Sequence, residues 1–171
     1  MGTVERVFVA GAGGQPMRPV DEVQAVAGRG LDGDRYATRR GYWTDVDECQ
    51  VTLIAGEDLD AITESSGVAV QDGQHRRNIV TRGVELRALA GRTFRIGGAT
   101  FAYDRPRPPC RYIEALTEPG MTRALAARRG GICVRVVESG LVRTGDAIEL
   151  LPVDDSLEPL RPGPIHRAPN R

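Results

Sequence analysis

One cysteine stands in surroundings that could make it reactive. Cys110 ends residues 105–110 (RPRPPC), and Arg111 follows it. The prolines of this run fix an extended backbone and lack backbone donors, so we expect a stiff, exposed segment. Nearby positive charge and a helix beginning just after the cysteine favour the thiolate, the form that binds metals or sulfur. The sequence therefore predicts that Cys110 carries the chemistry, as a metal ligand or as a sulfur carrier.

The other cysteines and the histidines have less activating surroundings. Cys49 and Cys133 lie beside or within apolar stretches, which is typical of inert buried thiols. Three scattered cysteines do not make a disulfide framework, and no pair of cysteines or histidines has the spacing of a zinc site. The G-x-S-x-G motif of a serine hydrolase is missing, and His75 alone does not predict a general base.

A second polar cluster, residues 75–78 (HRRN), stands at the entrance of an expected strand. Alternation along a strand places Arg76 and Asn78 on one face and Arg77 on the other. An arginine fork beside an amide could recognise a phosphate or a heterocycle. Two adjacent arginines that are simply solvated remain the alternative.

Residues 31–36 (LDGDRY) predict a turn in which Asp34 lies beside Arg35. The turn could be an Asx turn with a surface ion pair. It could instead present Arg35 to an anion, with Asp34 orienting the guanidinium. Composition leaves both interpretations open.

Residues 11–14 (GAGG) follow an expected strand, as the glycines of a dinucleotide-binding motif do. In that motif a helix begins on the last glycine, so that its N-terminus meets the pyrophosphate. Here Pro16 and Pro19 follow and oppose a regular helix. We therefore expect a glycine-rich loop at this position.

The composition narrows the class of protein. The 23 acidic residues balance the 23 basic ones, which argues against a general nucleic-acid binder. All the basic residues are arginines, so a lysine Schiff base and a P-loop lysine are excluded, while local anion sites remain open. The N-terminus has no signal-peptide pattern, and no 18-residue apolar run occurs, so we expect a cytoplasmic protein with reduced thiols that does not enter a membrane.

Short apolar runs between glycine-rich turns indicate a mainly β domain over residues 1–153, shaped as a barrel with a few short helices. We expect a long loop at 28–42 and a hairpin turn at 97–98. Expected strands are 3–10, 19–27, 50–55, 78–81, 93–96, 99–103, 132–137 and 147–150, and expected helices are 56–65, 111–117 and 120–129. Residues 154–171 are polar and proline-rich, which predicts a flexible tail.

Several stretches in their order along the chain resemble a stand-alone MOSC domain, the C-terminal domain of molybdenum cofactor sulfurases. They are 30–36 (GLDGDRY), 50–54 (QVTLI), 76–84 (RRNIVTRGV), 89–97 (LAGRTFRIG), the cysteine of 108–110 (PPC) and the glycines of 130–146. The resemblance spans roughly residues 3 to 150. It implies a distorted β-barrel, similar to the barrel domain of pyruvate kinase, and a pocket with an essential cysteine.

The resemblance also implies roles for particular residues. In this family the cysteine is proposed to carry a persulfide or to bind molybdenum of a molybdopterin cofactor, and Cys110 matches it. The cofactor-contacting arginine and asparagine match Arg76 and Asn78, and we expect Arg35, Asp34 and Arg77 to complete the cofactor site. Pyridoxal phosphate binding is a further attribute given to such domains at the level of the family.

Two functions follow from the resemblance, and a third from the arginines alone. The first is a molybdenum-cofactor protein that reduces small N-hydroxylated substrates with a redox partner. Because 171 residues leave no room for the N-terminal β domain of the amidoxime-reducing relatives, part of the cofactor envelope is expected to be absent or to come from a partner subunit. The second is a sulfur carrier loaded by a donor such as a cysteine desulfurase, and the third is a non-catalytic anion-binding module.

Overall fold

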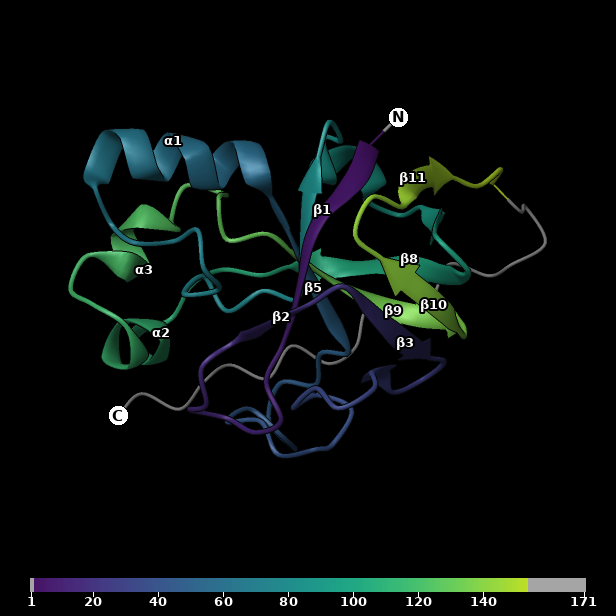
Figure 1. Ribbon diagram of the computed structural model, residues 1–171, viewed down its shortest axis with the longest axis horizontal. Helices are drawn as coiled ribbons and strands as arrows, with labels where there is room; N and C mark the ends of the chain where they lie inside the picture. The colour runs from purple at the N-terminus through teal and green to yellow at the C-terminus, as the bar shows by residue number, and fades with distance from the viewer. Residues whose placement is uncertain (1, 154–171) are drawn as a thin grey trace.

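The computed structural model describes residues 2–153, and short strands make up most of them (Figure 1). The strands are β1 (Gly2–Val9), β2 (Arg18–Val20), β3 (Glu22–Val26), β4 (Gly30–Leu31), β5 (Val51–Ala55), β6 (Ile79–Arg82), β7 (Thr93–Ile96), β8 (Ala99–Pro106), β9 (Ile132–Glu138), β10 (Gly140–Arg143) and β11 (Ala147–Leu150). The helices are α1 (Gly56–Ser66), α2 (Arg111–Leu116) and α3 (Met121–Ala124), with a 3₁₀ turn at Leu86–Leu89. The predicted mainly β architecture is confirmed.

The main sheet closes on itself into a barrel. Its eight strands run in the order β11-β7-β8-β9-β5-β6-β1-β2, and a further pairing joins β11 to β1. On one edge β1 pairs with β6, while its other edge pairs with β11 near Gly2 and with β2 near Val9. Seven strands therefore form the closed ring, and β2 only extends the edge of β1. A second sheet, β10-β3-β4, packs beside the barrel.

One parallel pair interrupts the antiparallel pattern of the described strands. β5 and β6 run in the same direction, with Leu53 opposite Ile79. Parallel neighbours need a crossover, and α1 begins it directly after β5. The helix buries Leu59 and Ile62, carries two acidic residues in its first turn, and ends at Gly67, whose φ of 67° lies in the left-handed region.

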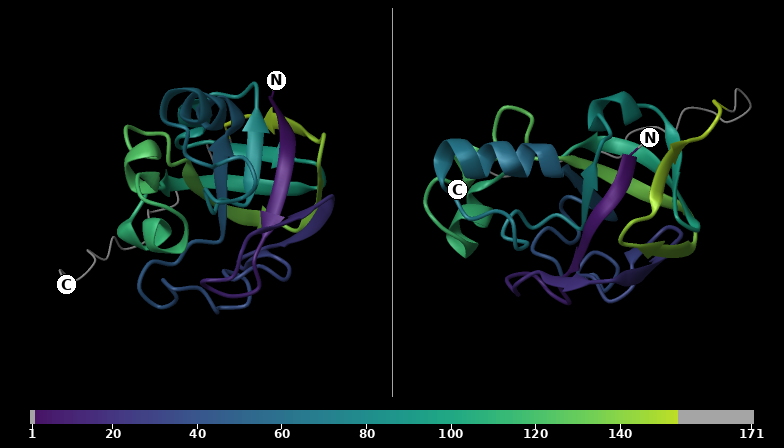
Figure 2. Two further views of the ribbon diagram at one scale, coloured as in Figure 1. Left: turned by 60° about the vertical axis from the view of Figure 1, so that its left-hand side comes forward. Right: turned by 45° about the horizontal axis from the view of Figure 1, so that its top comes forward.

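Strand alternation divides the apolar residues between two cores. Val7, Leu53 and Ile79 belong to the cluster that fills the barrel. Their neighbours in the chain, which point to the opposite face, pack under the helices instead, as Phe8 and Ile54 do. All three helices lie on one side of the barrel in both views of Figure 2. The helices therefore cover the outer face of the barrel at β1, β5 and β6.

Several predicted boundaries were wrong. The predicted strand 19–27 divides into β2 and β3, the predicted loop 28–42 contains β4, and β10 was not predicted. The helix expected at 120–129 ends at Ala124, because Ala127 and Arg128 adopt positive φ values of 53° and 71°. The predicted tail, 154–171, lies outside the described residues. No helix in residues 2–153 has the length and hydropathy that a membrane span requires.

Candidate functional site

A cavity of about 490 Å³ lies where the Cys110 segment meets the residues that lead into β6. Its volume is in the range of small-molecule sites. Five arginines but one acidic residue contribute to the lining, which consists of Gly13, Arg35, Tyr36, Gly41, Tyr42, Trp43, Val46, Asp47, Arg76, Arg77, Arg105, Pro106, Arg107, Pro108, Pro109, Cys110, Tyr112 and Ile113. Cys110 and Arg76, which the sequence pointed to separately, thus share one cavity.

Cys110 sits at a junction whose backbone is held from two sides. It follows the extended end of β8 and immediately precedes α2, and it is half-buried. Its carbonyl oxygen accepts hydrogen bonds from the Ile113 N–H at 3.2 Å and from Thr122 Oγ1 at 3.2 Å. The buried side chain of Ile113 anchors α2 beneath it. The cysteine therefore has a fixed backbone position at the cavity wall.

Of the arginines expected around Cys110, two are paired with an aspartate from a distant loop and one is exposed. Arg105 and Arg107 both form ion pairs with Asp47. Burial opposes ionisation of Asp47, but Arg107 and Arg105 outweigh it and lower its pKa. Arg111 is exposed and lies outside the cavity lining. The positive charge near Cys110 is therefore partly compensated, which the sequence did not predict.

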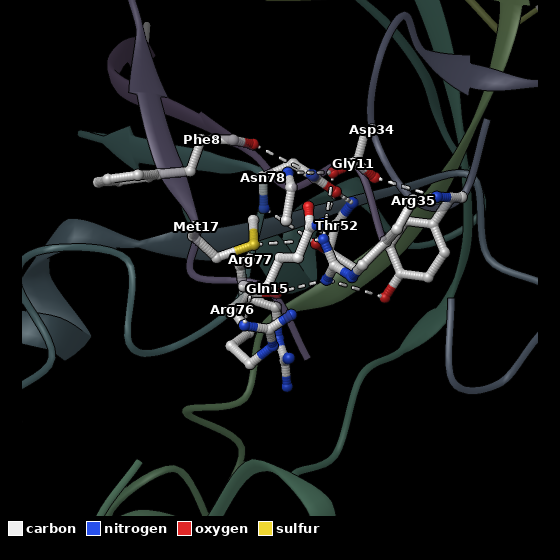
Figure 3. Close-up of polar contacts among 12 residues, drawn as sticks. Phe8, Gly11, Gln15, Met17, Asp34, Arg35, Thr52, Arg76, Arg77 and Asn78 are labelled. Atoms are coloured by element: carbon white, nitrogen blue, oxygen red, sulfur yellow. Dashed lines mark hydrogen bonds and ion pairs between the residues drawn. The ribbon is translucent and has the colours of Figure 1, made fainter. Parts of the chain in front are cut away.

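Arg76 has a buried donor that no other described residue satisfies (Figure 3). Its Nη1 donates to the Gln15 carbonyl at 2.7 Å, while Nη2 is buried without a hydrogen-bond partner. Burial, and then the neighbouring charge of Arg35, lower the pKa of Arg76. A positive φ of 59° is unusual for this residue type, and such strain recurs at functional sites. Arg76 is thus the cavity arginine best placed to bind an acceptor.

Asp34 and Arg35 form a buried ion pair that supports this arginine. The pair spans 3.1 Å, and Arg35 Nη2 donates to the Arg76 carbonyl at 3.0 Å. Asp34 is fully buried, and its two oxygens accept the N–H groups of Ala10 and Tyr36. Asp34 therefore belongs to the scaffold, and its predicted contact with a cofactor does not fit. Arg35 lines the cavity as well as holding Arg76.

Asn78 is likewise part of the scaffold. Its Oδ1 accepts from the Thr52 N–H at 3.1 Å and from Thr52 Oγ1 at 3.0 Å, and its Nδ2 donates to the Phe8 carbonyl at 3.2 Å (Figure 3). The side chain is fully buried and lies outside the cavity lining. The predicted contact of Asn78 with a cofactor therefore does not fit, because the barrel wall already uses its amide.

Arg77 does line the cavity, but its guanidinium is tied to backbone. Nε donates to the Gly130 carbonyl at 2.6 Å, and Nη2 contacts the Arg107 carbonyl at 3.4 Å. A Cβ at position 130 would lie 2.3 Å from that Arg107 oxygen, so glycine is required for the close approach. Arg77 thereby links the residues before β6 to the segment that carries Cys110.

His75 is a core residue. It is fully buried, and burial lowers its pKa to about 3. Its Nδ1 accepts the Arg77 N–H at 2.9 Å, and its ring packs edge-on against Phe8 at 5.4 Å. Because Nδ1 accepts from backbone, the neutral ring carries its proton on Nε2, which is buried without a partner among the described residues, so neither nitrogen is free to act as a general base.

Sequence reasoning missed the aromatic residues of the cavity. Tyr42 stacks on Tyr112 with ring centroids 3.8 Å apart and 15° between planes, and Trp43 meets Tyr42 edge-on at 4.9 Å. Tyr36 lies under the Arg35 guanidinium. Three of the chain's five tyrosine and tryptophan residues fall within residues 36–43, and this concentration in a polar loop was the available signal.

Together these features define a closed β-barrel protein with an arginine-lined cavity that contains one cysteine. The profile of the MOSC domain matches residues 40–149, which is more than half of the chain, and the chain belongs to the MOSC domain family. MOSC domains are known for molybdenum cofactor binding. No curated protein sequence matches the chain.

Solved structures that share the fold include the following three. The YuaD protein from Bacillus subtilis is 20% identical with a TM-score of 0.70, and the match covers 88% of this chain and 96% of that one. YiiM from Geobacillus stearothermophilus is 16% identical with a TM-score of 0.69, covering 91% and 78%. YiiM from Escherichia coli is 19% identical with a TM-score of 0.62, covering 88% and 70%. At these identities the likeness concerns the fold.

Proposed function

We propose that the protein binds a molybdenum cofactor in the cavity that contains Cys110 and Arg76, with the cysteine thiolate as ligand of the metal. The observation that carries this proposal is that Arg76 Nη2 is buried without a hydrogen-bond partner among residues 2–153, and that Arg76 shares a cavity with Cys110. An unsatisfied buried donor is costly, and a ligand oxygen would remove that cost. The cavity's excess of arginine over acidic residues also suits an anionic ligand.

The lining residues fit the parts of such a cofactor. Cys110 supplies the soft sulfur donor that molybdenum favours. Arg76 would donate to a pterin or phosphate oxygen, while Arg35 fixes the Arg76 backbone. The exposed face of the Tyr42 and Tyr112 stack offers a surface for a flat heterocycle. Asn78 would act only by holding the wall in position.

When bound, molybdenum would supply two-electron redox chemistry, for which the reduction of N-hydroxylated compounds is the proposed example. The protein's own contribution would be binding and orientation. Arg77 and Gly130 hold the Arg107 backbone against the start of β6, which keeps the two walls of the cavity together. A redox partner and a small-molecule substrate are part of this proposal.

Metal analysis tests the proposal directly. The protein is expressed in a host that makes molybdenum cofactor, and molybdenum by mass spectrometry and pterin fluorescence are measured on the purified protein. We expect retention by the wild-type protein and by Cys49→Ser, whose side chain lies outside the cavity, and loss by Cys110→Ser. Wild-type protein that retains neither metal nor pterin would overturn it.

A sulfur carrier is the second candidate, because Cys110 is half-buried rather than enclosed and lies at a cavity wall with Arg107. A persulfide carrier needs an accessible nucleophilic thiol near positive charge. After incubation with a cysteine desulfurase and cysteine, intact mass spectrometry should show a gain of about 32 Da, one sulfur atom, that disappears in Cys110→Ala. Added sulfur on Cys49 or Cys133 instead would contradict this candidate.

A further inference from the structure

The two other cysteines form a pair far from each other in sequence. Cys49 Sγ lies 2.8 Å from Cys133 Sγ, and both residues are buried. Cys49 stands just before β5, and Cys133 lies in the adjacent strand β9, opposite Thr52. Two cysteines whose sulfurs already lie this close need little movement of their side chains to form a disulfide. The sequence-based expectation of two separate inert thiols omits this contact.

The surroundings of the pair shift the pKa values of its two thiols in opposite directions. The hydrogen bond from the Cys49 thiol lowers the pKa of Cys133, burial opposes this, and Arg107 and Arg105 add to the lowering. Burial, and then the contact with Cys133, raise the pKa of Cys49. Cys133 is thus the sulfur that accepts the shared proton, and Cys49 is the donor.

Cys49 also lines a second cavity, of about 550 Å³, which adjoins the one that contains Cys110 and shares lining residues with it. Two polar atoms in its lining residues are buried without a hydrogen-bond partner among the described residues. They are Asp104 Oδ1, an acceptor, and Arg135 Nε, a donor. An unsatisfied donor and acceptor beside a thiol suit a small polar ligand that carries sulfur together with amide, amine or carboxylate groups.

We propose that Cys49 and Cys133 are a reversible dithiol–disulfide site, oxidised by a low-molecular-weight disulfide that enters this second cavity. Cys49 Sγ attacks one sulfur of the small disulfide, the S–S bond of that disulfide breaks, and the leaving sulfur takes the Cys49 proton and departs as a small thiol. Cys133 Sγ then attacks Cys49 Sγ, and the second small thiol leaves with the Cys133 proton. In sum two protein thiols and one small disulfide give one protein disulfide and two small thiols.

The proposal for this pair does not rest on cofactor binding at Cys110, although Cys49 follows a loop that contributes to the Cys110 cavity. Asp47, two residues before Cys49, holds Arg105 and Arg107 at the first cavity. Five residues line both cavities: Tyr36, Trp43, Val46, Asp47 and Arg105. A disulfide would link the end of this loop covalently to β9. Oxidation of the pair would therefore restrict the motion of Asp47.

Peptide mapping can identify which cysteines are linked, because trypsin cleaves after arginine but not before proline and so places the three cysteines in three different peptides. Cys49 falls in peptide 41–76, Cys110 in 96–111 and Cys133 in 130–135. Folded protein is incubated with oxidised glutathione, quenched in acid, blocked with N-ethylmaleimide and digested. We expect a loss of about 2 Da that corresponds to a link between peptides 41–76 and 130–135, reversed by dithiothreitol.

Single variants provide the matched controls. Cys110→Ser should keep the link between the two peptides, while Cys133→Ser should stop at one glutathione on Cys49. The wild-type measurement needs no variant, so a variant that fails to fold leaves the test intact. Free Cys49 and Cys133 in folded wild-type protein after prolonged oxidation, or a link that includes Cys110, would overturn the proposal.

Discussion

Two arginine-rich segments meet at the Cys110 cavity, and they use their polar side chains in opposite ways. Residues 75–78 (HRRN) enter β6 with every side chain buried, and backbone groups or neighbouring side chains take most of their hydrogen bonds. Residues 105–110 (RPRPPC) run along the other wall, where Pro106 and Pro108 are exposed and Cys110 is half-buried. The two stretches look alike in polarity and charge, yet the first mostly supports the fold, while the second is partly exposed and lines the cavity.

The difference shows what decides whether a polar residue can bind a ligand. A buried amide or guanidinium serves the scaffold when a strand nearby offers unpaired backbone groups, as Phe8 and Thr52 do for Asn78. A donor remains available to a ligand only where no backbone acceptor lies within reach, as at Arg76 Nη2. Residue type alone therefore does not separate Arg76 from Asn78.

The largest expected loss of stability comes from Asn78→Ala. The change leaves the Phe8 carbonyl and both Thr52 donors without the partner they have now, so the free energy of unfolding should fall by about 3 kcal/mol. Urea unfolding followed by circular dichroism measures this. Thr81→Ala, at a buried site in β6 with one hydrogen bond of 3.4 Å, is the control, with an expected loss of about 1 kcal/mol. Equal losses in the two variants would contradict the scaffold role of Asn78.

The next effect is a dependence of stability on pH through His75. Its pKa is lowered from 6.5 to about 3 by burial, so between these values the unfolded chain binds a proton that the folded chain does not. Stability is therefore complete above about pH 6.5 and is lost as pH falls, by about 2.5 kcal/mol between pH 7 and 4.5.

His75→Gln isolates this contribution, since every other titrating group is shared with the wild-type protein. Urea unfolding at pH 7, 6, 5 and 4.5 should give a shallower decline in the variant. Parallel declines would mean that the imidazole is protonated in the folded protein and that this segment is less enclosed than the structure has it.

Arg76→Gln should change the stability of the protein least. It should instead cause the largest change in binding of the molybdenum cofactor. The variant loses the bond to the Gln15 carbonyl but also removes a buried charge beside Arg35, so the free energy of unfolding should stay within about 1 kcal/mol of wild type. Molybdenum and pterin content should fall at least about tenfold. Arg111→Gln, at an exposed position outside the cavity, serves as the control. Unchanged molybdenum and pterin content in Arg76→Gln would mean that Arg76, like Asn78, only supports the fold.

Most of the barrel could be predicted from local pattern, and the failures have physical causes. Runs such as VTLIA in β5 are apolar on both faces because one face fills the barrel and the other packs under helices. β10 contains only two apolar residues, so its pairing with β3 decides its conformation. Residues 120–129 are rich in helix formers, but the chain turns at Ala127 and Arg128, and Gly130 then lies close to the Arg107 carbonyl.

Some residues of the cavity could be predicted from the sequence around them. Cys110 and Arg76 were singled out in this way and share a cavity, while their roles there stay predictions. The partners of Arg105 and Arg107 could not, because Asp47 lies 58 and 60 residues away from them. The contact between Cys49 and Cys133 spans 84 residues, and no spacing rule indicates it.

The joining of β1 to β11 has a consequence for biosynthesis. Gly2 pairs with Ile148, so β1 completes its edge with a strand that is synthesised much later. Contacts between strands so far apart in sequence are formed late and slow folding, because a long loop must close before any pairing energy is gained. Until β11 emerges, the nascent barrel remains an open sheet with an unpaired strand edge, which is the state in which chaperones recognise a chain and in which aggregation begins.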